Sequence, residues 1–261
     1  MSLKKLSNFI STKSKYKPEN IDGLNQWIYP YDPLQMTLED GNRVIGANDK
    51  SGNANSLYQI SGTWNRPYYA VKQYVENNVI DCQYDSESNP VGLKGDNLNI
   101  INNANVIYLF IIAKVLNSLD KQSLFSISSH AGWNPRFQCG LVKDGSNIYP
   151  YVTGKRLDEE VAITSTSTTP FVVGSWALFE YKLKFSNPVQ AQIIINGTEY
   201  LNTVPFFSEG LTSNTTCLRT ELNIAIDAQA QVKYGELCLY KRLTEISALD
   251  LTRLRNYMIK T

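Results

Sequence analysis

Histidine is nearly absent from this chain, and its cysteines are few and widely spaced. His130 is the single histidine among 261 residues, so a zinc site built from several histidines is excluded and a Ser-His-Asp triad would have to use it. No G-x-S-x-G motif supports such a triad. No C-x-x-C pair occurs, which favours isolated buried thiols over a metal or redox site; the cysteines are Cys82, Cys139, Cys217 and Cys238. We expect no metal and no cofactor.

An excess of charge and a long apolar run are also missing. The chain has 25 basic and 24 acidic residues, so the broad basic surface that nucleic acid requires is not expected. The longest apolar run, Val106–Ala113, is far shorter than the roughly 20 residues that cross a bilayer as a helix, so membrane insertion is not expected. The N-terminal lysines are not accompanied by the apolar core of a signal peptide, and we expect no export by that route.

What the chain does contain is a strong period of two. In Ala177–Phe185 the odd positions are apolar, while Glu180, Lys182 and Lys184 alternate with them, which predicts a strand with one face on a core and one in water. Asn196-Gly197 between two β-rich runs predicts a hairpin with a type I′ turn. Further strands are expected at Phe137–Val142, before a turn at Asp144-Gly145, and around Leu222, Ile224 and Ile226.

The run Val106–Ala113 is apolar at every position and rich in β-branched and aromatic residues. This pattern favours a central strand covered on both faces, with a buried helix as the competing interpretation. Asparagines before the run and Asn117-Ser118 after it keep it too short for a typical helix, so we prefer the strand.

One helix is expected at the C-terminus. Ser247-x-x-Asp250 resembles a capping box, and Leu251, Leu254 and Met258 follow at helical spacing, so the helix should close one end of a β-sandwich. No internal repeat or Pro/Gly-rich linker divides the chain. We therefore expect a basic N-terminal arm or attachment segment over residues 1–21 and one antiparallel β-sandwich domain over residues 22–261.

Catalytic carboxylates are not evident. Residues two apart on a strand face the same way, but no ordered E-x-D-x-E array occurs. The acidic cluster Asp158-Glu159-Glu160 follows Lys155 and Arg156, which favours a solvated charged turn over a catalytic pair. Asp85 and Glu87 lie in a segment that reads as loop. We therefore expect that the protein is not an enzyme and that it has no catalytic residues.

Several short motifs occur in an order that is typical of one family. They are Asp49-Lys-Ser-Gly-Asn53, Gln59, Arg66-Pro-Tyr68, Trp176, Asn196-Gly197, Tyr234-Gly-Glu-Leu-Cys-Leu-Tyr240-Lys-Arg242 and the helix end Tyr257-Met258. With these motifs the chain resembles the concanavalin A-like (laminin G-like) jelly-roll modules of bacteriophage virion proteins and bacterial surface proteins. The resemblance covers roughly residues 22–258, and it departs from the family pattern at Ala47, where a tryptophan is usual. It implies an all-β fold, an antiparallel β-sandwich of the concanavalin A-like jelly-roll type with a short C-terminal helix.

Binding chemistry is more plausible than catalysis, because sugars stack on aromatic faces and hydrogen-bond to a few planar polar groups. Three clusters fall in expected loops, where exposure is common, although core packing is the alternative for each. Their candidate ligand-binding residues are Trp64, then Trp133, Asn134 and Arg136, then Tyr149 and Tyr151.

Three functions follow from the resemblance and from these residues. The first is a bacteriophage tail-fibre-type virion structural protein that binds host cell-surface polysaccharide and other virion proteins. Because fibres of this class are generally trimeric, the resemblance implies a homotrimer on the phage tail or capsid surface. The second is a capsid decoration or other structural virion protein without glycan binding, and the third is a polysaccharide-degrading enzyme.

Overall fold

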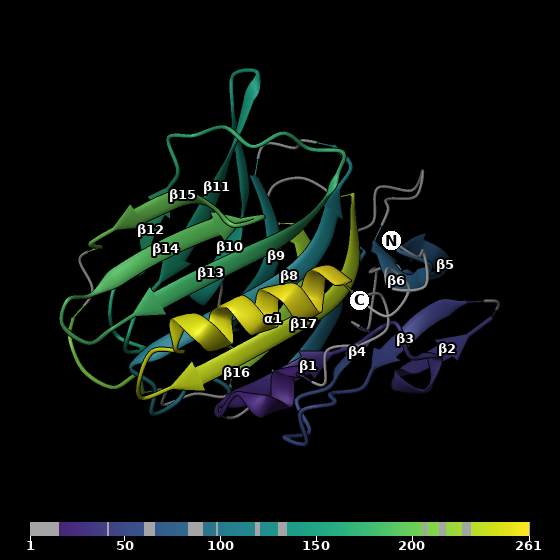
Figure 1. Ribbon diagram of the computed structural model, residues 1–261, viewed down its shortest axis with the longest axis horizontal. Coiled ribbons are helices and arrows are strands. Elements are labelled where there is room, and N and C mark those ends of the chain that lie inside the picture. Colours follow the sequence, from purple (N-terminus) through teal and green to yellow (C-terminus); the bar gives the residue numbers. More distant parts are fainter. Residues whose placement is uncertain are drawn as a thin grey trace, which may run out of the picture.

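The computed structural model describes residues 16–40, 42–59, 66–82, 91–97, 99–117, 121–129, 135–205, 208–213, 218–225 and 231–260. Nearly all regular structure in these ranges is antiparallel strand, as the period of two predicts. The strands form one continuous hydrogen-bonded network that folds into a front and a back layer (Figure 1). This confirms the antiparallel β-sandwich expected from the sequence.

The front layer has six strands in hydrogen-bonded order. They are β15 (Thr198–Thr203), β14 (Gln190–Ile195), β13 (Trp176–Lys184), β8 (Val106–Val115), β17 (Val232–Arg242) and β1 (Leu24–Ile28).

The back layer continues the network in a second order. Its strands are β12 (Ile163–Thr166), β11 (Asn147–Gly154), β10 (Pro135–Asp144), β9 (Lys121–Ser129), β16 (Leu218–Ala225), β7 (Leu93–Asn97), β4 (Leu57–Gln59), β3 (Arg43–Ala47) and β2 (Met36–Glu39). The hairpin of β5 (Tyr68–Tyr74) and β6 (Asn77–Cys82) links the layers, since β6 pairs with β17 and β5 meets β3. Two short 3₁₀ helices, η3 (Pro18–Asn20) and η4 (Pro33–Gln35), flank β1.

Strand β8 lies at the centre of the front layer and is buried on both faces. Its odd positions, including Ile107 and Leu109, join the large core between the layers. Its even positions, including Tyr108 and Phe110, join a second core on the outer face. The uniformly apolar run is therefore the central strand predicted from the sequence, and the helix interpretation is wrong.

The two turns predicted from the sequence have the backbone that their residues favour. Asn196 and Gly197 have φ values of 50° and 79°, as a type I′ turn requires, and they join β14 to β15. Gly145, with φ 61°, lies in the turn between β10 and β11. The hairpin predicted at Asn196-Gly197 and the turn predicted at Asp144-Gly145 are thus both confirmed.

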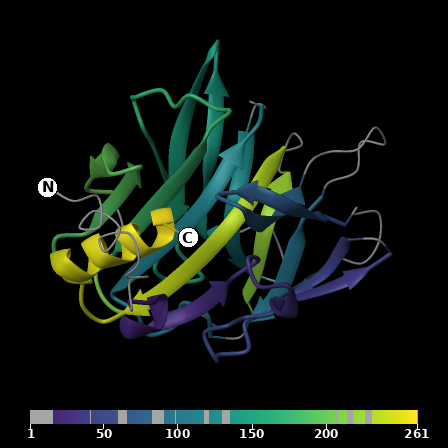
Figure 2. The same ribbon diagram turned by 45° about the vertical axis from the view of Figure 1, so that its right-hand side comes forward.

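The C-terminal helix α1 (Ala248–Lys260) begins at the expected capping box. The Asp250 backbone amide donates to the Ser247 hydroxyl at 3.1 Å, and that hydroxyl donates to the Asp250 carboxylate at 2.8 Å. Leu254 and Met258 are buried in the outer core of the front layer. The helix lies along the outer face of this layer rather than closing one end of the sandwich (Figures 1 and 2). That part of the prediction is wrong, because the even positions of β8 provide an apolar surface that needs a cover.

The position of α1 also corrects the expectation that one face of β13 meets water. Glu180 lies on that face but is only 6% exposed, because the helix covers it and Arg255 pairs with it. Lys182 instead reaches Glu245, 2.8 Å away, in the segment before the helix. The polar positions of β13 therefore bind the helix and the segment that leads to it.

The D-x-SGN motif holds β1 in position through hydrogen bonds. The Asp49 carboxylate accepts hydrogen bonds from the backbone amides of Trp27, Ser51 and Asn55 at 2.8 to 2.9 Å. The Trp27 indole in turn donates to the fully buried Glu236 carboxylate on β17 at 2.6 Å. The motif thus positions an edge strand, which is a structural role.

The segment before β1 packs on the domain from Tyr16 onward. Ile21 is buried, and the Tyr240 hydroxyl donates to the Pro18 carbonyl at 3.1 Å. Residues 1–15 of the expected N-terminal arm lie outside the described residues. Among the helices of the described ranges, none is long and apolar enough to span a bilayer.

Candidate functional site

A row of polar side chains crosses the outer face of the back layer. The strand register fixes its direction, because the neighbouring row of directly paired residues belongs to the core between the layers. That inner row is Leu93, Leu222, Phe125, Cys139 and Val152. Since successive side chains alternate between the faces, the next row points outward. Its directly paired members are Tyr58, Lys94, Glu221, Ser126, Gln138, Thr153 and Thr164.

A second outward row lies beside the first and contains Asp96, Arg219 and Ser128. We call the two rows together the polar face. Neighbouring strands lie 4.7–4.9 Å apart, so the seven strands of the first row span about 29 Å. An extended chain molecule could lie across this face.

The centre of the polar face holds polar groups that make no hydrogen bond to the described part of the protein. Ser126, Ser128 and Gln138 are only 3%, 8% and 5% exposed, yet their side chains make no hydrogen bond to any residue that the structure describes. Glu221 is 7% exposed, and its closest charged neighbour is Arg219, 3.8 Å away, beyond hydrogen-bonding distance. None of their oxygen or nitrogen atoms is among the fully buried side-chain atoms without a partner, so these four side chains can hydrogen-bond to a ligand or to water.

The environments of the two carboxyl groups of the face shift their pKa values in opposite directions. Burial raises the pKa of Glu221 to about 7, against the opposing charges of Arg219 and Lys94. Burial also raises the pKa of Asp96, but the hydrogen bond from Tyr58 and the charges of Lys94 and Arg219 outweigh it, so the net shift is downward. At neutral pH Asp96 is therefore ionised, while Glu221 is partly protonated.

Two lysines of this surface have no carboxylate partner within 4.0 Å in the described part of the chain. The Lys94 ammonium lies 5.7 Å from the centroid of the Tyr58 ring. Lys121 pairs in register with Val142, on the same face as Gln138, and its ammonium lies 5.2 Å from the centroid of Tyr151. Each ammonium group thus has an aromatic neighbour and remains available to an anion.

Arg136, expected in an exposed loop, lies instead within β10 and is fully buried. Its guanidinium forms an ion pair with Asp158 and donates to the Arg156 carbonyl, and burial lowers its pKa against the opposing charge of Asp158. The prediction of a ligand-binding Arg136 is wrong, because its donors are used inside the protein.

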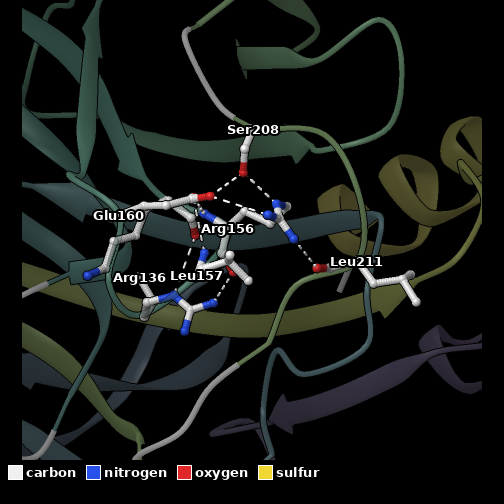
Figure 3. Close-up of polar contacts among 7 residues, drawn as sticks. Arg136, Arg156, Leu157, Glu160, Ser208 and Leu211 are labelled. Carbon is white, nitrogen blue, oxygen red and sulfur yellow. Dashed lines mark hydrogen bonds and ion pairs between the residues drawn. The ribbon is translucent and has the colours of Figure 1, made fainter.

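The acidic turn after β11 belongs to the same structural network (Figure 3). Glu160 accepts from the backbone amides of Arg156 and Leu157 at 2.9 and 3.1 Å. Ser208 donates to Glu160 and Arg156 reaches the Leu211 carbonyl at 3.0 Å, which ties this turn to the segment 208–213. The turn is therefore partly buried and structural rather than simply solvated.

The remaining candidates from the sequence divide into three groups. Tyr151, expected in a loop, lies in β11 and is fully buried, so its ring cannot stack on a ligand, and that prediction is wrong. Tyr149 is also in β11 rather than in a loop, but it is partly exposed and paired with Val142, next to the polar face. Trp64, Trp133 and Asn134 lie outside the described residues.

A pocket of about 230 Å³ lies on the opposite side of the molecule, between α1 and the strands β13 and β14. It is smaller than typical ligand sites of about 300–1,000 Å³. The charged groups that line it are already paired, Arg255 with Glu180 and Lys182 with Glu245. We therefore consider the polar face the better candidate.

Sequence reasoning missed the polar face because its members are separated by as many as 163 positions, from Tyr58 to Glu221. One signal was present: Gln138 lies between Phe137 and Cys139, which marks it as facing away from a core. Within the described ranges, no group of three or more His, Cys, Asp or Glu side chains is placed to hold a metal ion.

Comparison with solved structures supports the fold. The chain is similar to the receptor-binding domain of botulinum neurotoxin type G, with a TM-score of 0.57 and 11% identity over 92% of this chain and 52% of that one. It is similar to the binding domain of Paraclostridial mosquitocidal protein 1, with a TM-score of 0.57 and 13% identity over 91% and 52%. An arabinofuranosidase complexed with arabinofuranosyl-alpha-1,2-xylobiose matches with a TM-score of 0.58 and 11% identity over 83% and 50%.

The chain spans about half the length of these three solved chains. No family model matches the sequence, and no curated protein matches it. With its antiparallel layers, single C-terminal helix and these neighbours, the protein is a β-sandwich of the jelly-roll type.

Proposed function

We propose that this protein binds surface glycans and that the polar face is its binding site. The observation that carries the proposal is the set of mostly buried polar side chains at the centre of that face that make no hydrogen bond within the described part of the protein, Ser126, Ser128, Gln138 and Glu221. Sugars bind through hydrogen bonds to hydroxyl, amide and carboxyl groups, and this face offers all three kinds. A ligand that hydrogen-bonds to these groups replaces the water that reaches them, so each contact adds about 0.5–1.5 kcal/mol of affinity.

Two further features support a carbohydrate polymer. The row is about 29 Å long, which suits an extended chain rather than a compact metabolite. Partly exposed tyrosines, Tyr58 on β4 and Tyr149 on β11, lie toward its two sides and can stack on sugar rings. The neighbours described above include a receptor-binding domain and a sugar complex, but at 11% identity they support only a fold that accommodates such sites.

The biological setting we propose is a bacteriophage virion. On the resemblance of the sequence motifs, the chain would serve as a tail-fibre-type protein that contacts host surface polysaccharide and other virion proteins, as a homotrimer. A capsid decoration protein without glycan affinity is the alternative. Mass in solution tests the oligomer, and a monomer at micromolar concentration counts against a fibre tip, while labelling of virions for electron microscopy tests the location.

We propose binding rather than cleavage. A glycosidase needs two carboxyl groups free to act on the scissile bond. On the polar face both Asp96 oxygens are engaged, one by the Tyr58 hydroxyl and one by the Arg219 guanidinium, which leaves Glu221 without a second free carboxylate among the described residues of the face. Incubation with capsular polysaccharide should therefore release no new reducing ends.

The decisive experiment is a glycan array with two matched variants. Gln138→Ala removes an amide from the polar face, and Gln192→Ala removes one from the exposed face of β14, where it bonds Glu199. Loss of one or two hydrogen bonds should weaken binding by about tenfold in Gln138→Ala and leave Gln192→Ala unchanged. Equal binding by both variants, with unchanged circular dichroism, would show that the ligand lies elsewhere.

A further inference from the structure

The outer surface of the back layer carries two lysines without a carboxylate partner, one in the polar face and one beside it. Lys94, in the first row, and Lys121, opposite Val142 and outside the two rows, have no carboxylate within 4.0 Å among the described residues. Lys94 lies two strands from Ser126 within the first row, and Lys121 lies five residues from Ser126 along β9. A ligand that runs obliquely over this surface, from β7 toward the start of β9, would therefore pass both ammonium groups.

With the other charged groups around Glu221 included, the net charge of this surface is positive. On β16 the neighbour is Arg219, which lies 3.5 Å from Asp96 and 3.8 Å from Glu221. On β7 the neighbours are Lys94, directly opposite Glu221, and Asp96, while β9 presents the neutral Ser126. Among the described residues of this surface, Lys94, Lys121 and Arg219 against Asp96 and Glu221 give a net charge of +1 with Glu221 ionised and of +2 with Glu221 protonated.

We propose that the ligand of the polar face is an anionic, carboxylate-bearing polysaccharide, held by Lys94 and Lys121, and that its binding takes up one proton at Glu221. This inference rests on the proposed glycan-binding function and specifies its ligand class. A carboxylate of the ligand accepts from each ammonium group, while the neutral Glu221 carboxyl group donates to a ligand oxygen instead of repelling the chain.

The direction of the pH effect follows from the environment of Glu221. Burial, the largest influence on this group, raises its pKa to about 7, so lowering the pH from 8 to 6 protonates it. Uronic acids remain ionised in this range, as ordinary carboxylic acids do. The binding of an anionic chain should therefore strengthen as the pH falls from 8 to 6.

The test compares polygalacturonate with neutral dextran by isothermal titration calorimetry on the whole chain. We expect polygalacturonate to bind more tightly than dextran, several-fold more tightly at pH 6 than at pH 8. The double variant Lys94→Gln with Lys121→Gln should lose at least about tenfold in affinity. Lys17→Gln, which removes the same charge from an exposed site before β1, should not change it.

A second variant tests the proton uptake separately. Glu221→Gln mimics the neutral carboxyl group in shape and should bind polygalacturonate at pH 8 as tightly as at pH 6. Equal affinity for dextran, or an unchanged double variant, would overturn the anionic ligand; a pH dependence that persists in Glu221→Gln would overturn the role of that residue. Binding of neutral glycans alone would overturn this inference and leave the proposed function intact, whereas folded protein that binds no glycan on an array contradicts both.

Discussion

The Glu180 carboxylate on β13 accepts three hydrogen bonds from the Arg255 guanidinium on α1, at 2.8, 3.0 and 2.8 Å. Glu180 is 6% exposed, so this pair fixes the helix on the sheet at a point where an unpaired charge would be costly. The outer core around Leu254 and Met258 provides the apolar part of the same contact. The helix is therefore a structural layer of the domain, and it covers the front layer on the side opposite the polar face.

Removal of this guanidinium should destabilise the fold. Arg255→Ala leaves the Glu180 carboxylate buried without its partner, and we expect a loss of about 2–3 kcal/mol in the free energy of unfolding. Burial already raises the pKa of Glu180 and Arg255 opposes this shift, so the variant should be less impaired at pH 4, where Glu180 is neutral. Urea denaturation at pH 4 and pH 8 measures both effects. Arg253→Ala, an exposed arginine on the same helix, should change stability by less than about 0.5 kcal/mol.

Arg136 should be required for stability and not for binding. Its side chain is fully buried and paired with Asp158, so Arg136→Ala should lower the free energy of unfolding by about 3–5 kcal/mol. Lys143→Ala, at the exposed end of the same strand, serves as the control and should be nearly neutral. A stable Arg136→Ala protein with weakened glycan affinity would reverse this assignment.

The sequence predicted local structure well, because local structure depends on neighbouring residues. The alternation of apolar and polar residues was sufficient to predict the strand β13, and Asn196-Gly197 was sufficient to predict the turn between β14 and β15. It did not reveal that α1 covers the polar positions of β13, because the partner of an amphipathic helix is decided by tertiary packing. Arg136 was misplaced for a similar reason, since the Asp158 that compensates its buried charge lies 22 residues away.

The candidate site was harder to predict than the fold. Glu221, Ser126 and Gln138 become neighbours only when β16, β9 and β10 pair in one register. A shift of one residue would send all three into the core, so the site depends on the register and not on any local motif. The tyrosines that the composition favoured as ligand platforms instead divide into one buried residue, Tyr151, and one partly exposed residue, Tyr149.

Two glycines should respond differently to the same substitution. A methyl group at Gly140 would overlap the backbone carbonyl oxygen of Gln122 on β9, so Gly140→Ala should cost about 3 kcal/mol or more, or prevent folding. Gly197 has open space around it but a φ of 79°, so Gly197→Ala should cost only about 1 kcal/mol from backbone strain. Thermal unfolding followed by circular dichroism compares the two. Equal costs would contradict the close approach of β9 and β10 at Gly140.

The pH dependence of stability provides a ligand-free test of the environment of Glu221. Burial raises the pKa of Glu221 from 4.5, its ordinary value, which applies to the unfolded chain, to about 7 in the folded protein. Between these two pH values the folded chain therefore holds more protons than the unfolded chain. The free energy of unfolding should therefore decrease as the pH rises from 4.5 to 7, by up to about 3 kcal/mol. Glu221→Gln removes this titration, so the variant should be more stable than the wild type at pH 8 and nearly equal to it at pH 4.5. Glu199→Gln, an exposed change of the same kind on β15, should keep the wild-type profile. Urea denaturation across this pH range measures the free energy of unfolding of all three proteins. Parallel plots of this free energy against pH for the wild type and Glu221→Gln would mean that the Glu221 carboxyl group is well solvated, in conflict with its 7% exposure.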